Sequence, residues 1–196
     1  MPTDVFYRLS EEKRDRIYTV LLDEFSSKSL AEANVKSIVE RLGIARGSFY
    51  QYFEDLNDSY FTVLEQETVD IHSLFMAVLH QSGGDIAQAL DRFGEEAARV
   101  LFKERAYMVY KNRYLYWTPE LDAAWQQYRW QAARHDPQKQ AQIALQKQMG
   151  SDERIRFVKA VVHSLIQRLF QENWDEDAFL KHYRQYIEWI KKGVTC

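Results

Sequence analysis

The sequence is poor in residues that interrupt helices or cross-link a chain. Cysteine occurs once, as Cys196, which excludes an intramolecular disulfide and a cysteine-based zinc site. Only 3 prolines and 7 glycines occur in 196 residues, so long stretches are free to be helical. No apolar run approaches the roughly 20 residues of a membrane span, and the N-terminus carries no signal-peptide pattern. We therefore expect a cytoplasmic protein with no membrane partner.

An excess of positive charge is also missing. The formal net charge is -3, so no global basic field favours nucleic acid or an anionic membrane. The first 55 residues hold eight lysines and arginines against ten aspartates and glutamates, a formal charge of -2. This balance counts against nucleic-acid binding, although a local basic patch suffices for it.

Patterns of strands and of common catalytic sites are absent too. No segment shows sustained apolar–polar alternation with turn residues, so we predict no strands. The histidines form no H-E-x-x-H pair, and no phosphate-cradling glycine loop or nucleophile elbow occurs. We expect neither an enzyme nor a metal or cofactor site.

Helical periodicity and cap residues cover most of the chain. The sequence predicts a first helix from Ser10, a second from Asn34 to Leu42 and a short third from Arg46 to Tyr52. Gly43 follows the second helix, where a left-handed residue is expected. Two short helices joined by a glycine turn indicate a helix-turn-helix.

A larger helical bundle is expected after this unit. A long fourth helix should run from Asp55 or Asn57 through about His80 and end at Gly83-Gly84. Further helices are predicted over 85–102, 104–116, 119–134, 138–148, 152–172 and 176–192. The predicted fold class is all-α with about nine to ten helices, divided into residues 1–54 and 55–196.

The third helix has the composition of a nucleic-acid reader. Arg46, Gly47 and Ser48 begin it directly after the turn, where a recognition helix presents polar groups to base edges. Tyr50 and Tyr52 carry hydroxyls that are suited to phosphate contacts. Rings at this spacing are also common in helix cores, so spacing alone leaves a plain packing unit as an equal alternative.

The run from Arg16 to Phe53 resembles the N-terminal domain of TetR-family transcriptional repressors. The matching parts are Asn34, Ile38, Leu42-Gly43-Ile44, Gly47-Ser48-Phe49-Tyr50 and Tyr52-Phe53. The resemblance covers roughly residues 10–65. It implies a DNA-binding domain at 1–54 and an effector-binding and dimerisation domain at 55–196.

Carried onto this sequence, the resemblance also implies the DNA-contacting residues. Base reading falls on Arg46, Gly47, Ser48 and Gln51, phosphate contacts fall on Tyr50 and Tyr52, and a further DNA contact falls on Lys36. The family's usual lysine at the start of the fourth helix is replaced by Leu56, next to Glu54 and Asp55. This departure leaves open a helical interaction protein with degenerate DNA contacts.

Residues 107–130 hold eight aromatic rings, and several recur on one helical face. Two such helices can wall an apolar pocket with a few polar groups. The candidates for an effector pocket are Tyr107, Tyr110, Arg113, Tyr114, Trp117, Trp125 and Tyr128. The same rings suit a solid core, and a pocket would also suit an all-α enzyme, although no acid–base pair accompanies it.

The first of the last two predicted helices is apolar over more than half of its circumference, from Ile155 to Phe170, which favours burial on two sides. In a terminal pair of helices, this indicates a partner subunit. The interface candidates are Ile155, Val158, Val162, Leu165, Leu169, Tyr183 and Ile187. An interior helix of a monomer is the alternative. The sequence thus predicts a homodimeric repressor that binds a palindromic double-stranded DNA operator and is released by a small, largely apolar or aromatic effector.

Overall fold

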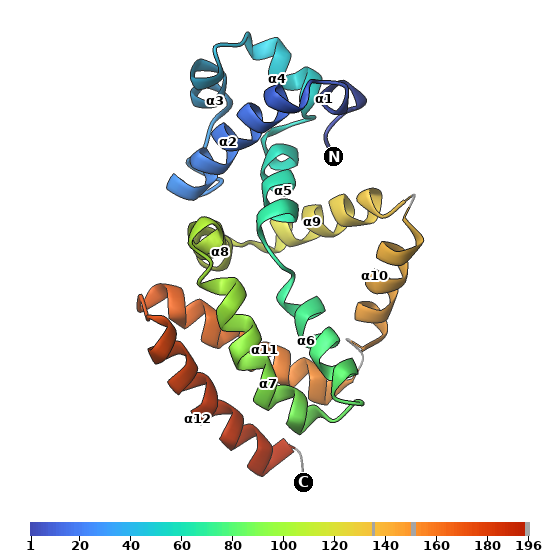
Figure 1. Ribbon diagram of the computed structural model, residues 1–196, viewed down its shortest axis with the longest axis vertical. Coiled ribbons are helices and arrows are strands. Elements are labelled where there is room, and N and C mark those ends of the chain that lie inside the picture. Colours follow the sequence, from blue (N-terminus) through green and yellow to red (C-terminus); the bar gives the residue numbers. More distant parts are fainter. Residues whose placement is uncertain (135, 150–151, 195–196) are drawn as a thin grey trace. The chain divides into compact units, whose positions relative to one another are not determined.

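The computed structural model describes residues 1–134, 136–149 and 152–194, and within these ranges it contains helices and no strand (Figure 1). Cys196 lies outside the described residues. The helices are α1 (Asp4–Tyr7), α2 (Glu11–Ser27), α3 (Val35–Leu42), α4 (Arg46–Tyr52), α5 (Leu56–Glu67), α6 (Ile71–Gln81), α7 (Ile86–Leu101), α8 (Glu104–Tyr116), α9 (Pro119–Ala132), α10 (Pro137–Met149), α11 (Glu153–Gln171) and α12 (Glu176–Val194). The all-α prediction is confirmed. None of these helices is both long enough and apolar enough to cross a membrane.

Two features of the helix pattern differ from the prediction. Helix α1 was not predicted, because four residues are too few to show periodicity. The expected long fourth helix is wrong, since it ends at Glu67 and restarts at Ile71. Between them the Thr68 hydroxyl donates to the Leu64 carbonyl, and the Asp70 carboxylate accepts from the first backbone N–H groups of α6. These local bonds end one helix and cap the next.

The chain packs as two compact units, which are described separately. Unit 1 takes in α1 to α5 together with α8 and α9, and unit 2 takes in α6, α7 and α10 to α12. Helices α5, α8 and α9 therefore pack with the helix-turn-helix, although they come after residue 54. The functional boundary between residues 54 and 55 stays a prediction.

One core holds unit 1 together. Phe25, Ile38 and Phe53 are fully buried in it, and Trp125 and Tyr128 of α9 are buried in the same cluster. Helix α9 packs on α5, which Figure 1 shows beside it. The segment with the candidate effector residues thus shares its core with the helix-turn-helix.

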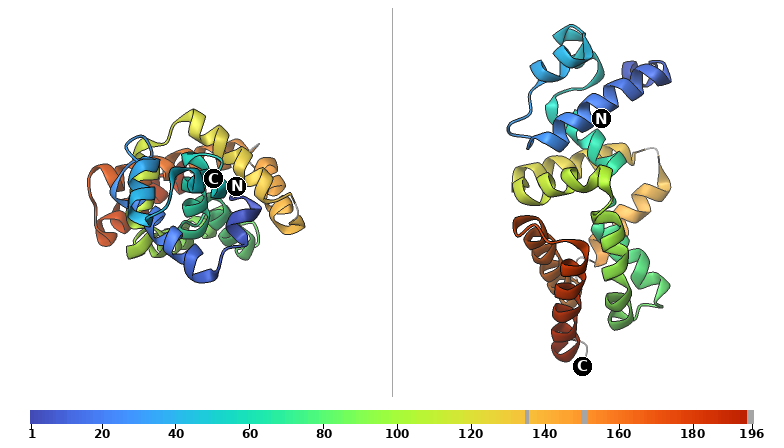
Figure 2. Two further views of the ribbon diagram at one scale, coloured as in Figure 1. Left: turned by 90° about the horizontal axis from the view of Figure 1, so that it is seen from above. Right: turned by 60° about the vertical axis from the view of Figure 1, so that its left-hand side comes forward.

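In unit 2, α12 packs on both α7 and α11 (Figure 2). The contact with α7 is close at Gly94, where an added Cβ would lie 2.5 Å from Cδ1 of Tyr183. The Tyr183 hydroxyl donates to the Leu90 carbonyl at 2.7 Å. Glycine allows this approach because it has no side chain.

Candidate nucleic-acid interface and effector region

The turn between α3 and α4 is fixed by backbone and side-chain bonds. The Asn34 side chain caps α3 by accepting from the Ser37 N–H at 2.9 Å. Gly43 has φ +66°, as predicted, and Arg16 of α2 donates to the Leu42 carbonyl at 3.1 Å. The two short helices are therefore held at a defined angle, which a helix-turn-helix requires.

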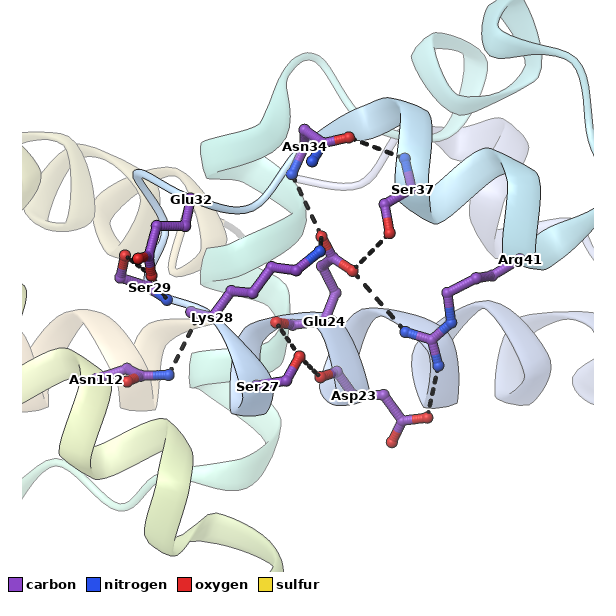
Figure 3. Close-up of polar contacts among 10 residues, drawn as sticks. All are labelled: Asp23, Glu24, Ser27, Lys28, Ser29, Glu32, Asn34, Ser37, Arg41 and Asn112. Carbon is purple, nitrogen blue, oxygen red and sulfur yellow. Dashed lines mark hydrogen bonds and ion pairs between the residues drawn. The ribbon is translucent and has the colours of Figure 1, made fainter.

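A buried carboxylate ties α3 to α2 (Figure 3). Glu24 is 1% exposed and accepts from Lys28 Nζ at 2.7 Å, Ser37 Oγ at 2.9 Å and the Asn34 N–H at 3.4 Å. Burial by itself raises the pKa of Glu24, but these hydrogen bonds outweigh it and lower the pKa. Sequence reasoning missed Glu24, whose signal was a charge on the apolar face that also carries Leu21.

Helix α4 exposes one side, which carries most of the predicted reading residues. Arg46, Gly47 and Gln51 are exposed, Ser48 is half-buried, and Tyr50 is 44% exposed. Arg46 donates to the Tyr50 hydroxyl at 3.3 Å and lies 5.9 Å from the centre of its ring. Arg46 and Tyr50 thus form a single donor-rich pair, one helical turn apart.

The opposite side of α4 is locked into the core of unit 1. Phe49 and Phe53 are buried, as their spacing predicted. Tyr52 is also buried, at 5% exposure, which differs from the expectation that it projects. Its ring packs on Phe6 of the unpredicted helix α1, and Lys13 lies 5.7 Å from the ring centre. Lys13, which sequence reasoning missed, is an exposed cation beside the recognition helix.

The acidic stretch after α4 has a structural role. Asp55 caps α5 by accepting from the Asp58 N–H at 2.7 Å, and Asp58 accepts from the Glu54 N–H at 3.0 Å. Leu56, at the position of the family's lysine, is half-buried and packs against the core of unit 1. This position therefore offers no cation to a phosphate.

The candidate effector residues lie in unit 1, and three of them gather around Phe61 of α5. Trp117, Trp125 and Tyr128 contact its ring, with centroids 6.4, 5.4 and 5.5 Å away. The Arg113 guanidinium lies 5.0 Å from the Trp117 ring centre and 5.6 Å from that of Trp125. On α8, Tyr110 is buried, and Tyr107 and Tyr114 are half-buried.

Helix α8 also reaches the end of α2. The Asn112 side-chain amide donates to the carbonyl of Phe25 at 2.9 Å. It also donates to the carbonyl of Lys28 at 3.0 Å (Figure 3). These carbonyls lie in the last turn of α2 or just past it, so Asn112 caps that helix. Sequence reasoning missed this contact, because the bonded residues are more than 80 positions apart.

Most of the predicted interface residues are core residues of unit 2. Val158, Val162, Leu165, Leu169, Tyr183 and Ile187 are buried within the single chain, and Ile155 is half-buried. The structure thus places six of the seven inside unit 2 rather than on an exposed face. The large exposed rings of α11 and α12 are Phe157, at 48% exposure, and Trp189, at 58%.

Comparisons with known proteins agree with this fold. Residues 86–193 match the family model described as Tetracyclin repressor, C-terminal domain. A TetR family transcriptional regulator from Chloroflexus aurantiacus J-10-FL is 26% identical, with 98% of each chain covered and a TM-score of 0.51. None of the curated proteins matches.

Two more distant structures share the fold. NalD, the secondary repressor of the MexAB-OprM multidrug efflux pump in Pseudomonas aeruginosa, is 19% identical, with 91% of this chain and 96% of that chain covered and a TM-score of 0.56. The fatty acid degradation regulator FadR from Bacillus halodurans is 14% identical, with 92% and 96% covered and a TM-score of 0.56. Because the family model matches more than half of the sequence, this chain belongs to the TetR family of transcriptional regulators.

Proposed function

We propose that the protein is a homodimeric transcriptional repressor that binds a palindromic operator and releases it when a small, largely apolar or aromatic effector binds. The observation that carries this proposal is helix α4, which is anchored by Phe49 and Phe53 and exposes Arg46, Gly47 and Gln51. A short helix held in this way suits the major groove. The similarity of the fold to that of NalD, a repressor, favours a repressor over an activator.

The residues of this region have different proposed parts in DNA binding. Arg46 reads a base edge, with Ser48 and Gln51 beside it, and Gly47 lets the backbone come close. Tyr50, together with Tyr52 if its hydroxyl reaches the surface, bonds a phosphate. The exposed cations Lys36 and Lys13 are attracted to the phosphates of any duplex DNA, and this attraction weakens as the salt concentration rises.

A palindromic operator needs two copies of the reading helix, which a dimer supplies. We assign the dimer contact to the exposed face of α11 and α12. Phe157, Ala160 and Ser164 are exposed at helical spacing on α11, and Trp189 is exposed on α12. Small residues beside large rings allow two helix pairs to approach and form a four-helix bundle.

Effector binding acts on the reading unit through α5. Trp117, Trp125 and Tyr128 contact Phe61 of α5 inside the core that also supports α4, and Arg113 lies over the two indole rings. A ligand among these side chains displaces α5 only if it binds one arrangement of the core more tightly than the other.

DNA binding tests the proposal directly. The DNA upstream of the protein's own gene and a scrambled duplex of equal length are titrated across a salt series, with wild type and Arg46→Ala. We expect wild type to prefer the upstream DNA and Arg46→Ala to lose that preference. Equal, weak binding of wild type to both duplexes would instead indicate a helical interaction protein.

A further inference from the structure

In the aromatic cluster of unit 1, one buried hydrogen-bond donor has no acceptor and a guanidinium has a single long contact. Trp125 is 5% exposed, and its buried Nε1–H has no hydrogen-bond partner among the described residues. The only polar contact of the Arg113 guanidinium in the described part of the chain is with Thr68 Oγ1, at 3.5 Å. Arg113 otherwise lies over the indole rings of Trp117 and Trp125.

The carboxylates of the neighbouring helix are occupied elsewhere. Glu67 of α5 pairs with Arg105 at 2.8 Å and accepts from the Tyr18 hydroxyl at 2.8 Å. Glu65 accepts from the Tyr128 hydroxyl at 3.2 Å. Within the described ranges, no carboxylate lies within ion-pair distance of Arg113. The Arg113 guanidinium thus carries a permanent positive charge without an ion-pair partner among the described residues.

Removing a guanidinium or an N–H group from water without giving it an acceptor is unfavourable in free energy. A carboxylate offers two acceptor oxygens, and its geometry matches the fork of a guanidinium. The guanidinium carbon and the Trp125 ring centroid are 5.6 Å apart. One carboxylate can bridge the two groups, because each N–H···O contact spans about 2.9 Å between heavy atoms.

We propose that Arg113 and Trp125 bind the carboxylate of an aromatic or aliphatic organic acid, whose apolar body packs against Phe61 and Trp117. This inference rests on the proposed function, since it specifies the effector class of the same region. The acid bridges α8 and α9 beside Phe61 of α5, so its binding bears directly on the helix that supports the reading unit.

Matched probes that differ in charge test this site. Calorimetric titrations compare benzoate, 1-naphthoate, indole-3-acetate and decanoate with the four corresponding carboxamides. At least one acid should bind wild type about tenfold more tightly than its amide, which is the loss expected when a charged acceptor is removed. Arg113→Gln should abolish this preference. Trp125→Phe, which keeps a ring but removes the N–H, should weaken acid binding several-fold.

The controls separate this inference from the proposed function. Arg99→Gln removes an exposed arginine of α7 and should leave every affinity unchanged, and thermal melts verify that all variants fold. Equal affinity for acid and amide, an unchanged preference in Arg113→Gln, or no acid binding up to millimolar concentration overturns the carboxylate site. Failure of the repressor proposal is read separately, from the DNA titrations without ligand. A protein that prefers its upstream DNA but shows no preference for acids retains the function and loses only this site.

Discussion

Gly47 is a residue that the fold itself does not require. A Cβ added there would meet nothing within 4 Å, and the backbone has ordinary helical geometry. Inside a helix, glycine is less favourable than alanine by about 1 kcal/mol. The free energy of folding therefore favours alanine at this exposed position, and the close approach of the helix to DNA is the proposed reason for glycine.

Gly47→Ala should accordingly separate stability from function. We expect the midpoint of thermal unfolding to stay the same or rise slightly, while affinity for the upstream DNA falls. Gly43→Ala is the matched control, because φ at Gly43 is +66° and the substitution should destabilise the fold by about 1 kcal/mol. Undiminished DNA affinity in Gly47→Ala would show that close backbone approach is not its role.

Arg46, Tyr50 and Lys36 should differ in how they respond to salt and to DNA sequence. Arg46→Ala should cost about 1–3 kcal/mol on the cognate DNA and relax sequence preference. Tyr50→Phe removes a neutral hydroxyl, so it should weaken all sequences equally and keep the salt slope. Lys36→Ala should lower that slope by about one unit. The measurement is the affinity of each variant for cognate and scrambled duplexes across a salt series. An Arg46→Ala protein with unaltered preference would contradict the assignment of the reading edge.

At the scale of helices, several boundaries were predictable from local cap residues. Asn34 caps α3 as predicted, and Asp55, one of the two residues expected to begin the fourth helix, caps α5. Thr118 caps α9 ahead of Pro119. The break after Glu67 was missed because apolar periodicity continues across it. Asp70 nevertheless caps α6 through side-chain bonds to its first backbone N–H groups, and these bonds start a new helix there.

The candidate sites were predictable only in part. The exposed side of α4 follows from the spacing of Phe49 and Phe53, which is a local property. The burial of Tyr52 depends on Phe6, and the cap formed by Asn112 depends on the end of α2. Such contacts join segments that are distant in the sequence, and the periodicity of one segment does not predict which other segment it contacts.

Asn112 joins α8 to α2, so its loss should affect both stability and coupling. Asn112→Ala leaves the carbonyls of Phe25 and Lys28 without their donor and should cost about 1–2 kcal/mol. In chemical denaturation, Gln126→Ala on the exposed surface of α9 should show no change. Any effector that releases wild type from DNA should release Asn112→Ala less completely. Wild-type stability in Asn112→Ala would show that solvent caps α2 equally well.

Gly94 sets the distance between α7 and α12. Gly94→Ala places a Cβ 2.5 Å from the Tyr183 ring, and the repacking should cost about 1–3 kcal/mol. Gly193→Ala is the control, because it lies in the last turn of α12 with nothing within 4 Å of the added atom. Thermal melts of the two variants should differ clearly. Equal melting temperatures would mean that α12 shifts at little cost.

For the whole molecule, the wide apolar face of α11 and α12 has two possible uses. Such a face fits a partner subunit, and it fits equally well the other helices of the same chain. Leu165 and Leu169 are completely buried within unit 2, so these two side chains serve its own core. Periodicity gives the extent of an apolar face but does not identify the surface that covers it. On these two helices, the exposed rings of Phe157 and Trp189 are the large apolar side chains that a second copy of the chain would contact in the proposed dimer.

The dimer proposal therefore predicts opposite outcomes for exposed and buried positions on the same helices. Phe157→Glu and Trp189→Glu should convert the dimer to a folded monomer, because each places a charge in the proposed contact. Leu165→Glu should instead unfold unit 2, since it buries an unpaired charge in the core. Lys159→Glu, at another exposed position of α11, is the control for a change of charge. Sedimentation at micromolar concentration gives the mass, and thermal melts report folding.

A folded monomer should also bind the palindrome far more weakly, because its two half-sites are then no longer bound as a unit. A monomeric wild type, or dimers that persist in both ring variants, would remove this face from the assembly.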